Sequence, residues 1–245
     1  MKKGKKIIIT VGVAILVLAA ILITVLYTNG FSGIHNHTVP KDEQIKVACV
    51  GDSITYGHGI SGWAKNNYPA QLQNILEDDY HVANFGHSGR TLSNNGDKPY
   101  TESEQYRLSI EYDADIIVFM LGTNDSKPEN WTNADIFIAE YEKMLNDYKQ
   151  NNPDVKIILC TPTAAFYPDG KSEGKTNFDI QPSIVEQIKT RIITFALLNE
   201  YECIDMYSLT YGHHEWFKKD NVHPSKEGAS VIAQAVASKI KNLGD

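Results

Sequence analysis

A serine and a histidine near opposite ends of the chain offer the residue types of nucleophilic catalysis. Ser53 follows a Gly-Asp pair at the end of an apolar run, 45–50, and His223 stands three residues after Asp220. An aspartate at that spacing in a turn can bond Nδ1 of the histidine, which leaves Nε2 free to take a proton from a serine. Alone, each residue is equally typical of a helix cap or a surface turn, so the argument needs all three together.

Two further segments carry small and polar residues that could donate hydrogen bonds to a developing oxyanion. Gly89 and Gly86 belong to a polar stretch after a second apolar run, and Asn124 lies in the segment Gly-Thr-Asn-Asp after a third. Tetrahedral acyl-transfer intermediates need such donors, and losing one typically costs ~10²–10³-fold in turnover. The candidates are the backbone N–H groups of Ser53 and Gly89 and the side-chain amide of Asn124, with Gly86 as the weaker choice.

The runs that precede these segments have the pattern of buried strands. Short stretches rich in Val and Ile alternate with stretches whose apolar residues recur every three or four positions. The predicted strands cover 45–50, 80–85, 115–121, 155–160 and 202–206, and the predicted helices cover 68–77, 134–149, 183–198 and 225–243. This alternation predicts one α/β domain with a parallel sheet covered on both faces. The carboxyl ends of such strands, where ligands bind, would bring the polar segments together.

An apolar segment precedes the α/β pattern. The first six residues include four lysines, and an uncharged run follows at 7–27. At ~1.5 Å per residue this run forms a helix of ~30 Å, which is enough to cross a bilayer core, and the lysines favour a cytoplasmic N-terminus. We therefore expect a single-pass membrane anchor at 1–27, a linker at 28–44 and an extracytoplasmic domain at 45–245. A cleaved signal peptide with secretion is the alternative, although 25–30 offers no clear cleavage site.

Charge and cysteine content argue against several classes of partner. The formal net charge is −7, and because the first 27 residues hold four lysines and no acids, the remainder carries −11. Such an acidic domain is a poor partner for nucleic acid. Cys49, Cys160 and Cys203 lie in or beside strand-like runs, which favours free buried thiols over disulfides. No spacing, including the His pair at 213–214, matches a metal or cofactor site, and the oligomeric state stays open.

Four short blocks, taken in order, resemble those of the GDSL, or SGNH, hydrolase family. They are Gly51-Asp52-Ser53-Ile54, Ser88-Gly89-Arg90-Thr91, Gly122-Thr123-Asn124-Asp125 and Asp220 to Pro224. The resemblance spans about 45–243 and implies a flavodoxin-like three-layer sandwich and ester hydrolysis without a metal or other cofactor. It also implies that Ser53 is the nucleophile, His223 the base and Asp220 its orienting acid. The oxyanion hole would then combine Ser53, Gly89 and Asn124.

The opening block and the residues after it also resemble the branch described as sialate O-acetylesterase or acetylxylan-esterase-like. Aromatic residues are frequent near the polar segments, and they are Tyr56, Trp63, Tyr100, Trp131, Phe166, Tyr167 and Phe178. The long segment 161–182 reads as a lid or specificity loop. Rings flanked by polar residues suit stacking on sugars, although ordinary loop packing explains them equally well. We therefore expect a small acyl ester, an acetylated saccharide above all, as substrate.

Three alternatives remain open at this stage. An O-acyltransferase acting on cell-surface glycan would use the same residues, with a sugar hydroxyl in place of water. A lysophospholipase-like acylhydrolase would prefer long acyl chains, which a membrane anchor would bring within reach. A glycan-binding module without turnover would keep the pocket and lose the chemistry.

Overall fold

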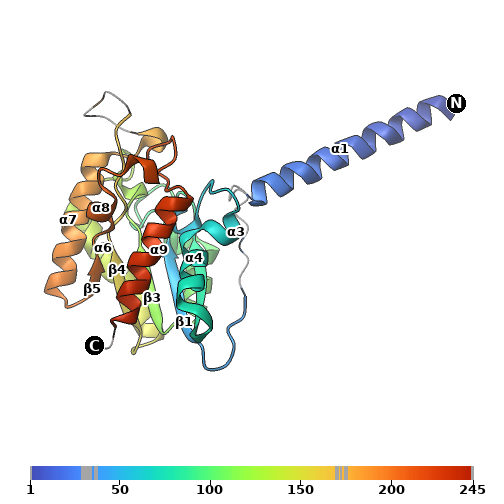
Figure 1. Ribbon diagram of the computed structural model, residues 1–245. Coiled ribbons are helices and arrows are strands. Elements are labelled where there is room, and N and C mark those ends of the chain that lie inside the picture. Colours follow the sequence, from blue (N-terminus) through green and yellow to red (C-terminus); the bar gives the residue numbers. More distant parts are fainter. Residues whose placement is uncertain are drawn as a thin grey trace.

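Five parallel strands form the central sheet of the protein (Figure 1). The structure is a computed structural model that describes residues 2–28, 35, 38–168, 171, 173 and 176–243. The strands are β1 (Ile45–Gly51), β2 (Tyr80–Gly86), β3 (Ile116–Met120), β4 (Lys156–Cys160) and β5 (Glu202–Ile204). They are ordered β2-β1-β3-β4-β5, and every neighbouring pair is parallel.

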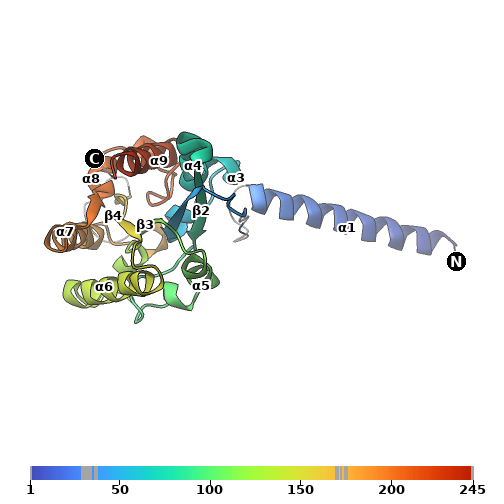
Figure 2. The same cartoon turned by 90° about the horizontal axis from the view of Figure 1, so that it is seen from below.

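Helices cover both faces of this sheet (Figure 2). The helices are α1 (Lys2–Thr28), α2 (Ser53–Tyr56), α3 (Trp63–Asn66), α4 (Tyr68–Leu76), α5 (Glu104–Glu111), α6 (Ala134–Asn151), α7 (Pro182–Leu198), α8 (Met206–Thr210) and α9 (Lys226–Lys241). Helices α4 and α9 lie on one face, and α5, α6 and α7 lie on the other. The predicted three-layer α/β sandwich is therefore confirmed.

The alternation of side chains along β1 explains why both faces need a cover. Val47 and Cys49 pack into the cluster under α4 and α9, whereas Ala48 and Val50 pack into the cluster under α6 and α7. All four side chains are completely buried. Successive residues of a strand point to opposite faces, so an uninterrupted apolar run is what a sheet covered on both sides requires.

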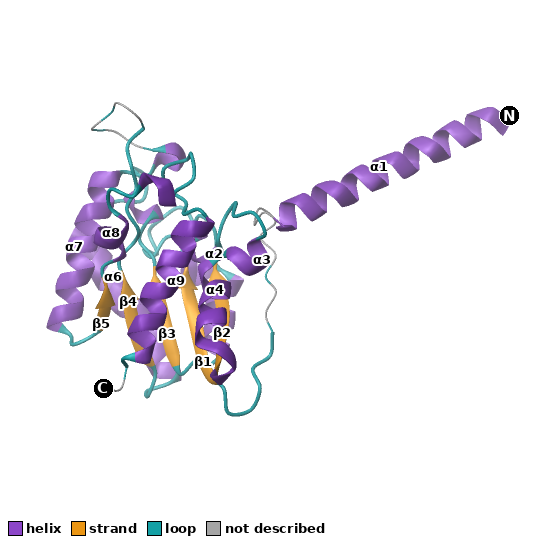
Figure 3. Ribbon diagram, in the orientation of Figure 1, coloured by secondary structure: helices purple, strands orange, loops and turns teal. Residues whose placement is uncertain are grey.

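The strand order places a reversal beside β1. The chain crosses from β1 to β2 on one side and then returns past β1 to β3, so the loops after β1 and β3 diverge. A crevice at the carboxyl ends of the strands is expected at such a reversal. Figure 3 shows the loops and short helices gathered at that edge of the sheet.

Helix α5 was not predicted from the sequence, and its composition explains why. Its buried residues, Gln105 and Ser109, are polar, while its apolar residues Tyr106, Leu108 and Ile110 are only partly buried against the core. The Ser109 hydroxyl bonds the Tyr148 hydroxyl of α6 at 2.7 Å, and Ser103 caps the helix by accepting from the N–H of Tyr106. Polar contacts that form only after folding, together with this partial apolar packing, hold the helix in place.

The N-terminal helix α1 stands apart from the sheet (Figure 1). Its segment Val11–Thr28 has a mean hydropathy of 2.7 and is long and apolar enough to cross a membrane. Near its end, the ring of Tyr27 lies 6.0 Å from that of Trp63 in α3. The expected linker 28–44 falls partly outside the described residues, so the division into anchor, linker and domain stays a prediction.

The three cysteines are free thiols, and Cys203 is only partly buried.

Candidate active site

A tight turn after β1 places Ser53 at the carboxyl edge of the sheet. Asp52 caps helix α2 by accepting a hydrogen bond from the N–H of Ile54 at 2.9 Å. The helix ends after one turn at Gly57, which adopts a left-handed conformation with φ of 86° that glycine tolerates at no steric cost. Ser53 is therefore the first residue of a helix that is held at both ends.

A second turn, just before α9, holds the histidine. The carboxylate of Asp220 accepts hydrogen bonds from the backbone N–H groups of Val222 and His223, at 3.0 and 2.8 Å. Its other oxygen lies 3.0 Å from Nδ1 of His223. With Nδ1 as the donor in that bond, Nε2 of the neutral ring is left as an acceptor.

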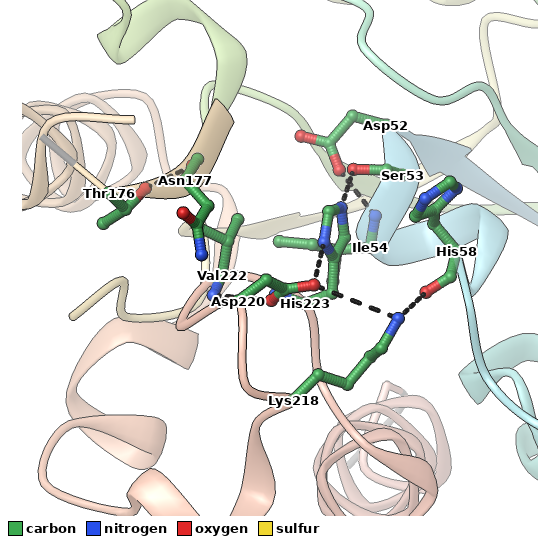
Figure 4. Close-up of polar contacts among 10 residues, drawn as sticks. All are labelled: Asp52, Ser53, Ile54, His58, Thr176, Asn177, Lys218, Asp220, Val222 and His223. Carbon is green, nitrogen blue, oxygen red and sulfur yellow. Dashed lines mark hydrogen bonds and ion pairs between the residues drawn. The ribbon is translucent and has the colours of Figure 1, made fainter. Parts of the chain in front are cut away.

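The fold brings the two turns into contact. Nε2 of His223 lies 2.9 Å from Oγ of Ser53, so the Ser53 hydroxyl can donate to the ring (Figure 4). Ser53 and His223 are only 7% and 5% exposed, which keeps this bond largely away from water. Serine, histidine and aspartate thus form one hydrogen-bonded row, as the sequence pattern predicted, and the row has the geometry in which a base activates a hydroxyl.

Electrostatics keep the aspartate ionised. Burial raises the pKa of Asp220, but the hydrogen bonds from the His223 side chain and backbone more than offset this and lower the pKa to about 2. The ammonium of Lys218 lies 3.9 Å from the same carboxylate. The site therefore holds a fixed negative charge beside Nδ1 throughout the neutral range.

The three residues predicted to donate to the oxyanion, Ser53, Gly89 and Asn124, line one pocket together with His223. Within the described part of the chain, the N–H groups of Ser53 and Gly89 have no hydrogen-bond acceptor. The Asn124 amide donates to the Arg90 carbonyl at 3.1 Å and makes a longer contact of 3.4 Å to the Asp52 carboxylate. The first bond orients the amide, and the second is weak enough to be exchanged for a stronger acceptor.

The structure separates the two glycines that the sequence offered as donors. Gly89 has a left-handed φ of 80° in an open position, so its N–H is presented on a turn. Gly86 ends strand β2, where an added Cβ would lie 2.1 Å from the backbone nitrogen of Tyr56. Gly86 is thus required by close packing against α2, and Gly89 remains the candidate donor.

Two carboxylates lie buried beneath the pocket. Asp52 and Asp125 are each 1% exposed, and burial raises the pKa of both to about 6. Asp125 accepts from the backbone N–H groups of Leu92 and Ser93, at 2.9 and 2.8 Å. Asp125 therefore ties the loop that carries Gly89 to the turn that carries Asn124.

The pocket has a volume of about 230 Å³ and includes residues that the sequence did not single out. Its lining comprises Ser53, His58, Ser88, Gly89, Lys98, Thr123, Asn124, Lys127, Phe178, Ile180, Val222 and His223. The His58 ring lies 5.0 Å from that of His223, and burial, with the nearby charge of His223, lowers the pKa of His58 to about 4. No local motif marks His58, Lys98 or Lys127, although the two lysines do lie close to the second and third blocks.

The expected lid 161–182 contributes to this pocket through its C-terminal part. Phe178 lies edge-on to His223, with ring centres 5.1 Å apart, and Ile180 is buried beside it. Residues 169, 170, 172, 174 and 175 of this segment lie outside the described residues.

Among the described residues, no group of three His, Cys, Asp or Glu side chains could hold a metal ion.

The sequence of this chain matches the model of the GDSL-like lipase/acylhydrolase family over residues 49–231. This range contains Ser53, Gly89, Asn124, Asp220 and His223. The chain belongs to that family. The resemblance carried by the four short blocks is therefore confirmed.

Curated relatives of this family include esterases. The chain is 37% identical over 226 residues to an acetylxylan esterase of Xylanibacter ruminicola, covering 82% of this chain and 44% of that protein. It is 22% identical over 198 residues to an arylesterase of Vibrio mimicus, covering 80% and 88%. The chain thus spans less than half the length of the acetylxylan esterase, so that relative contains other regions with no counterpart here.

Solved structures share the fold. A carbohydrate acetylesterase from Sinorhizobium meliloti superposes with a TM-score of 0.64 at 17% identity, covering 82% of this chain and all of that one. A lipase/acylhydrolase from Enterococcus faecalis gives a TM-score of 0.62 at 20% identity, with coverages of 81% and 96%. These structures have the same α/β sandwich, which supports the fold independently of the sequence match.

The buried Asp125 predicts a measurable dependence of stability on pH. Its pKa is about 6 in the folded protein and ~4 in an unfolded chain, so the folded state binds more protons in between. Stability therefore falls as pH rises through that window. Asp125→Asn removes this dependence. The melting temperature of the variant minus that of the parent should therefore rise from pH 4 to pH 7, even if the substitution also lowers or raises stability equally at every pH. Thermal unfolding in detergent measures the difference, with the exposed Asp78→Asn as control; a difference that falls or stays flat contradicts the raised pKa.

Proposed function

We propose that this protein is a carboxylic ester hydrolase that removes small acyl groups, in particular acetyl, from carbohydrate. The observation that carries the proposal is the 2.9 Å contact between Ser53 and His223, in a pocket where the N–H groups of Ser53 and Gly89 have no acceptor among the described residues. Membership of a family of lipases and acylhydrolases supports the reaction class. The 37% identity to an acetylxylan esterase supports acetyl as the acyl group and a saccharide as its carrier.

The proposed reaction follows from the hydrogen-bonded row. His223 takes the proton of Ser53 while Oγ attacks the ester carbonyl, and the N–H groups of Ser53 and Gly89 with the Asn124 amide stabilise the oxyanion. Collapse of this intermediate releases the sugar alcohol, which takes the proton from His223. Water then attacks the acyl-serine with His223 as base, which releases the acid and restores Ser53. Asp220 stabilises the imidazolium in both halves.

The roles of these side chains predict distinct losses. Ser53→Ala removes the nucleophile, so kcat for 4-nitrophenyl acetate should fall by at least ~10³-fold. Asp220→Asn should lower kcat by roughly 10⁴-fold, the loss that the equivalent change causes in serine proteases, because the amide no longer fixes the tautomer of His223. Ser208→Ala, on an exposed face of α8, is the matched control. A Ser53→Ala variant that keeps kcat within twofold of the parent would exclude the mechanism.

The size of the pocket predicts a preference for short acyl chains. A volume of about 230 Å³ is below the ~300–1,000 Å³ of pockets that enclose whole drug-sized ligands. We expect kcat/KM to fall by at least ~10-fold from 4-nitrophenyl acetate to the octanoate, and acetate to be released from acetylated xylo-oligosaccharides. A preference for octanoate would instead favour the lysophospholipase-like alternative. Acyl transfer to added saccharide in preference to water would favour the acyltransferase.

We also propose that α1 anchors the protein in a cell membrane, with the sheet domain outside the cytoplasm. An apolar segment of 18 residues with mean hydropathy 2.7 follows four lysines, which favour the cytoplasmic side. An uncleaved anchor predicts that the protein stays in the membrane fraction after an alkaline carbonate wash and retains its N-terminal lysines. N-terminal sequencing that begins beyond the apolar segment, with protein in the medium, would establish the secreted alternative.

A further inference from the structure

Two lysines flank the proposed oxyanion donors. The Cδ atom of Lys98 lies 3.8 Å from the position that a Cβ on Gly89 would occupy, so its stem passes beside that turn. The backbone N–H of Lys127 donates to the Asn124 carbonyl at 3.3 Å, and Lys127 is among the residues that line the same pocket. Lys98 belongs to the loop after β2, and Lys127 directly follows the short turn after β3. Two separate segments therefore each supply one cation to one pocket.

In the described part of the chain, the charge of Lys127 acts on the buried Asp52 carboxylate, but neither lysine is held in a close ion pair. There, neither ammonium group has an ion pair or a hydrogen bond, and the pocket lining contains no Asp or Glu. By contrast, Lys46, Lys239 and Arg107 pair with carboxylates elsewhere on the surface. Of the two buried carboxylates, Asp125 accepts from two backbone N–H groups, and Asp52 accepts from the N–H of Ile54 and contacts the Asn124 amide at 3.4 Å.

This positive pair is set in an acidic domain. Beyond its first 27 residues the chain carries a formal charge of −11, which repels anions on average. An anionic ligand can therefore gain from this pocket only through charges concentrated there. Lysine is a flexible point charge on a long stem, suited to a carboxylate or a phosphate presented at variable position. A neutral ester offers the lysine pair no charge to bind before reaction begins.

We propose that the pocket selects an acylated sugar bearing an anionic group, a carboxylate or a phosphate, which Lys98 and Lys127 hold while the ester lies against Ser53. This inference rests on the proposed esterase function and names its substrate class. The rival role for the lysines is general stabilisation of the oxyanion, which would assist neutral and anionic substrates alike. The two roles differ in the ratio of activities rather than in either activity alone.

Three mono-acetylated probes with the same ring test the proposal: a methyl glucoside, a methyl glucuronide and a methyl glucoside 6-phosphate. We expect the parent protein to show a higher kcat/KM for at least one anionic probe than for the neutral one, with the advantage shrinking as salt is added. The glucuronide and phosphate arms identify which anion is preferred. Replacing both lysines, as Lys98→Gln with Lys127→Gln, should lower the ratio of anionic to neutral kcat/KM by about 10-fold or more.

Lys143→Gln removes the same charge from an exposed position on α6 and should leave the ratio unchanged. Turnover of 4-nitrophenyl acetate by each variant verifies that the site is intact. A parent that hydrolyses all three probes equally, or a double variant that loses activity on all three in equal proportion, would overturn the anionic substrate class while leaving the esterase function standing. A parent inactive on every ester would overturn both.

Discussion

The hydrogen bond between Ser53 and His223 joins residues 170 positions apart in the sequence, and the rest of the fold brings them to within 2.9 Å. Neither side chain could hold this position by local structure. Ser53 depends on the turn after β1, and His223 depends on the turn before α9, whose apolar side chains join those of α4, β1 and β3 in one buried cluster. The site is thus a consequence of tertiary packing, which brings the turn before the last helix to the carboxyl end of the first strand.

Close backbone approach at the sheet edge is the second constraint. Gly51 and Gly86 are paired in register at the ends of β1 and β2. A Cβ at Gly51 would lie 2.1 Å from Oγ1 of Thr55, and a Cβ at Gly86 would meet the backbone of Tyr56 at the same distance. Helix α2 can therefore lie directly on the strand ends only because both positions lack a side chain. Because α2 lies so close to the strand ends, Ser53 faces the pocket rather than open solvent.

The sequence alone predicted the positions of the strands and the grouping of the serine, histidine and aspartate. It did not predict much of the pocket wall. Strands buried on both faces leave continuous apolar runs such as the one in β3, and Asp220 reaches His223 through a three-residue turn, which is a local property. Helix α5 was missed because its two buried residues, Gln105 and Ser109, are polar. His58, Lys98 and Lys127 were missed because their relation to Ser53 arises from tertiary contacts. Helix α2, at four residues, is too short for any periodic signal.

The arrangement of charge around His223 explains how one imidazole can gain a proton in a largely buried place. In the proposed reaction, transfer from Ser53 creates a cation there, and its nearest partner is Asp220, which stays ionised with a pKa of about 2. The adjacent ring of His58 would repel that cation if it were charged, but burial lowers its pKa to about 4, so at neutral pH it is an uncharged wall. The ammonium of Lys218 lies 3.9 Å from the Asp220 carboxylate, so it competes only weakly with His223 for that charge. It also donates to the His58 carbonyl at 3.4 Å, which links the loop after α2 to the turn that carries Asp220. In the proposed reaction, the proton on His223 is thus stabilised by the short contact with the ionised Asp220, which suits a base that must both accept and release a proton in each turnover.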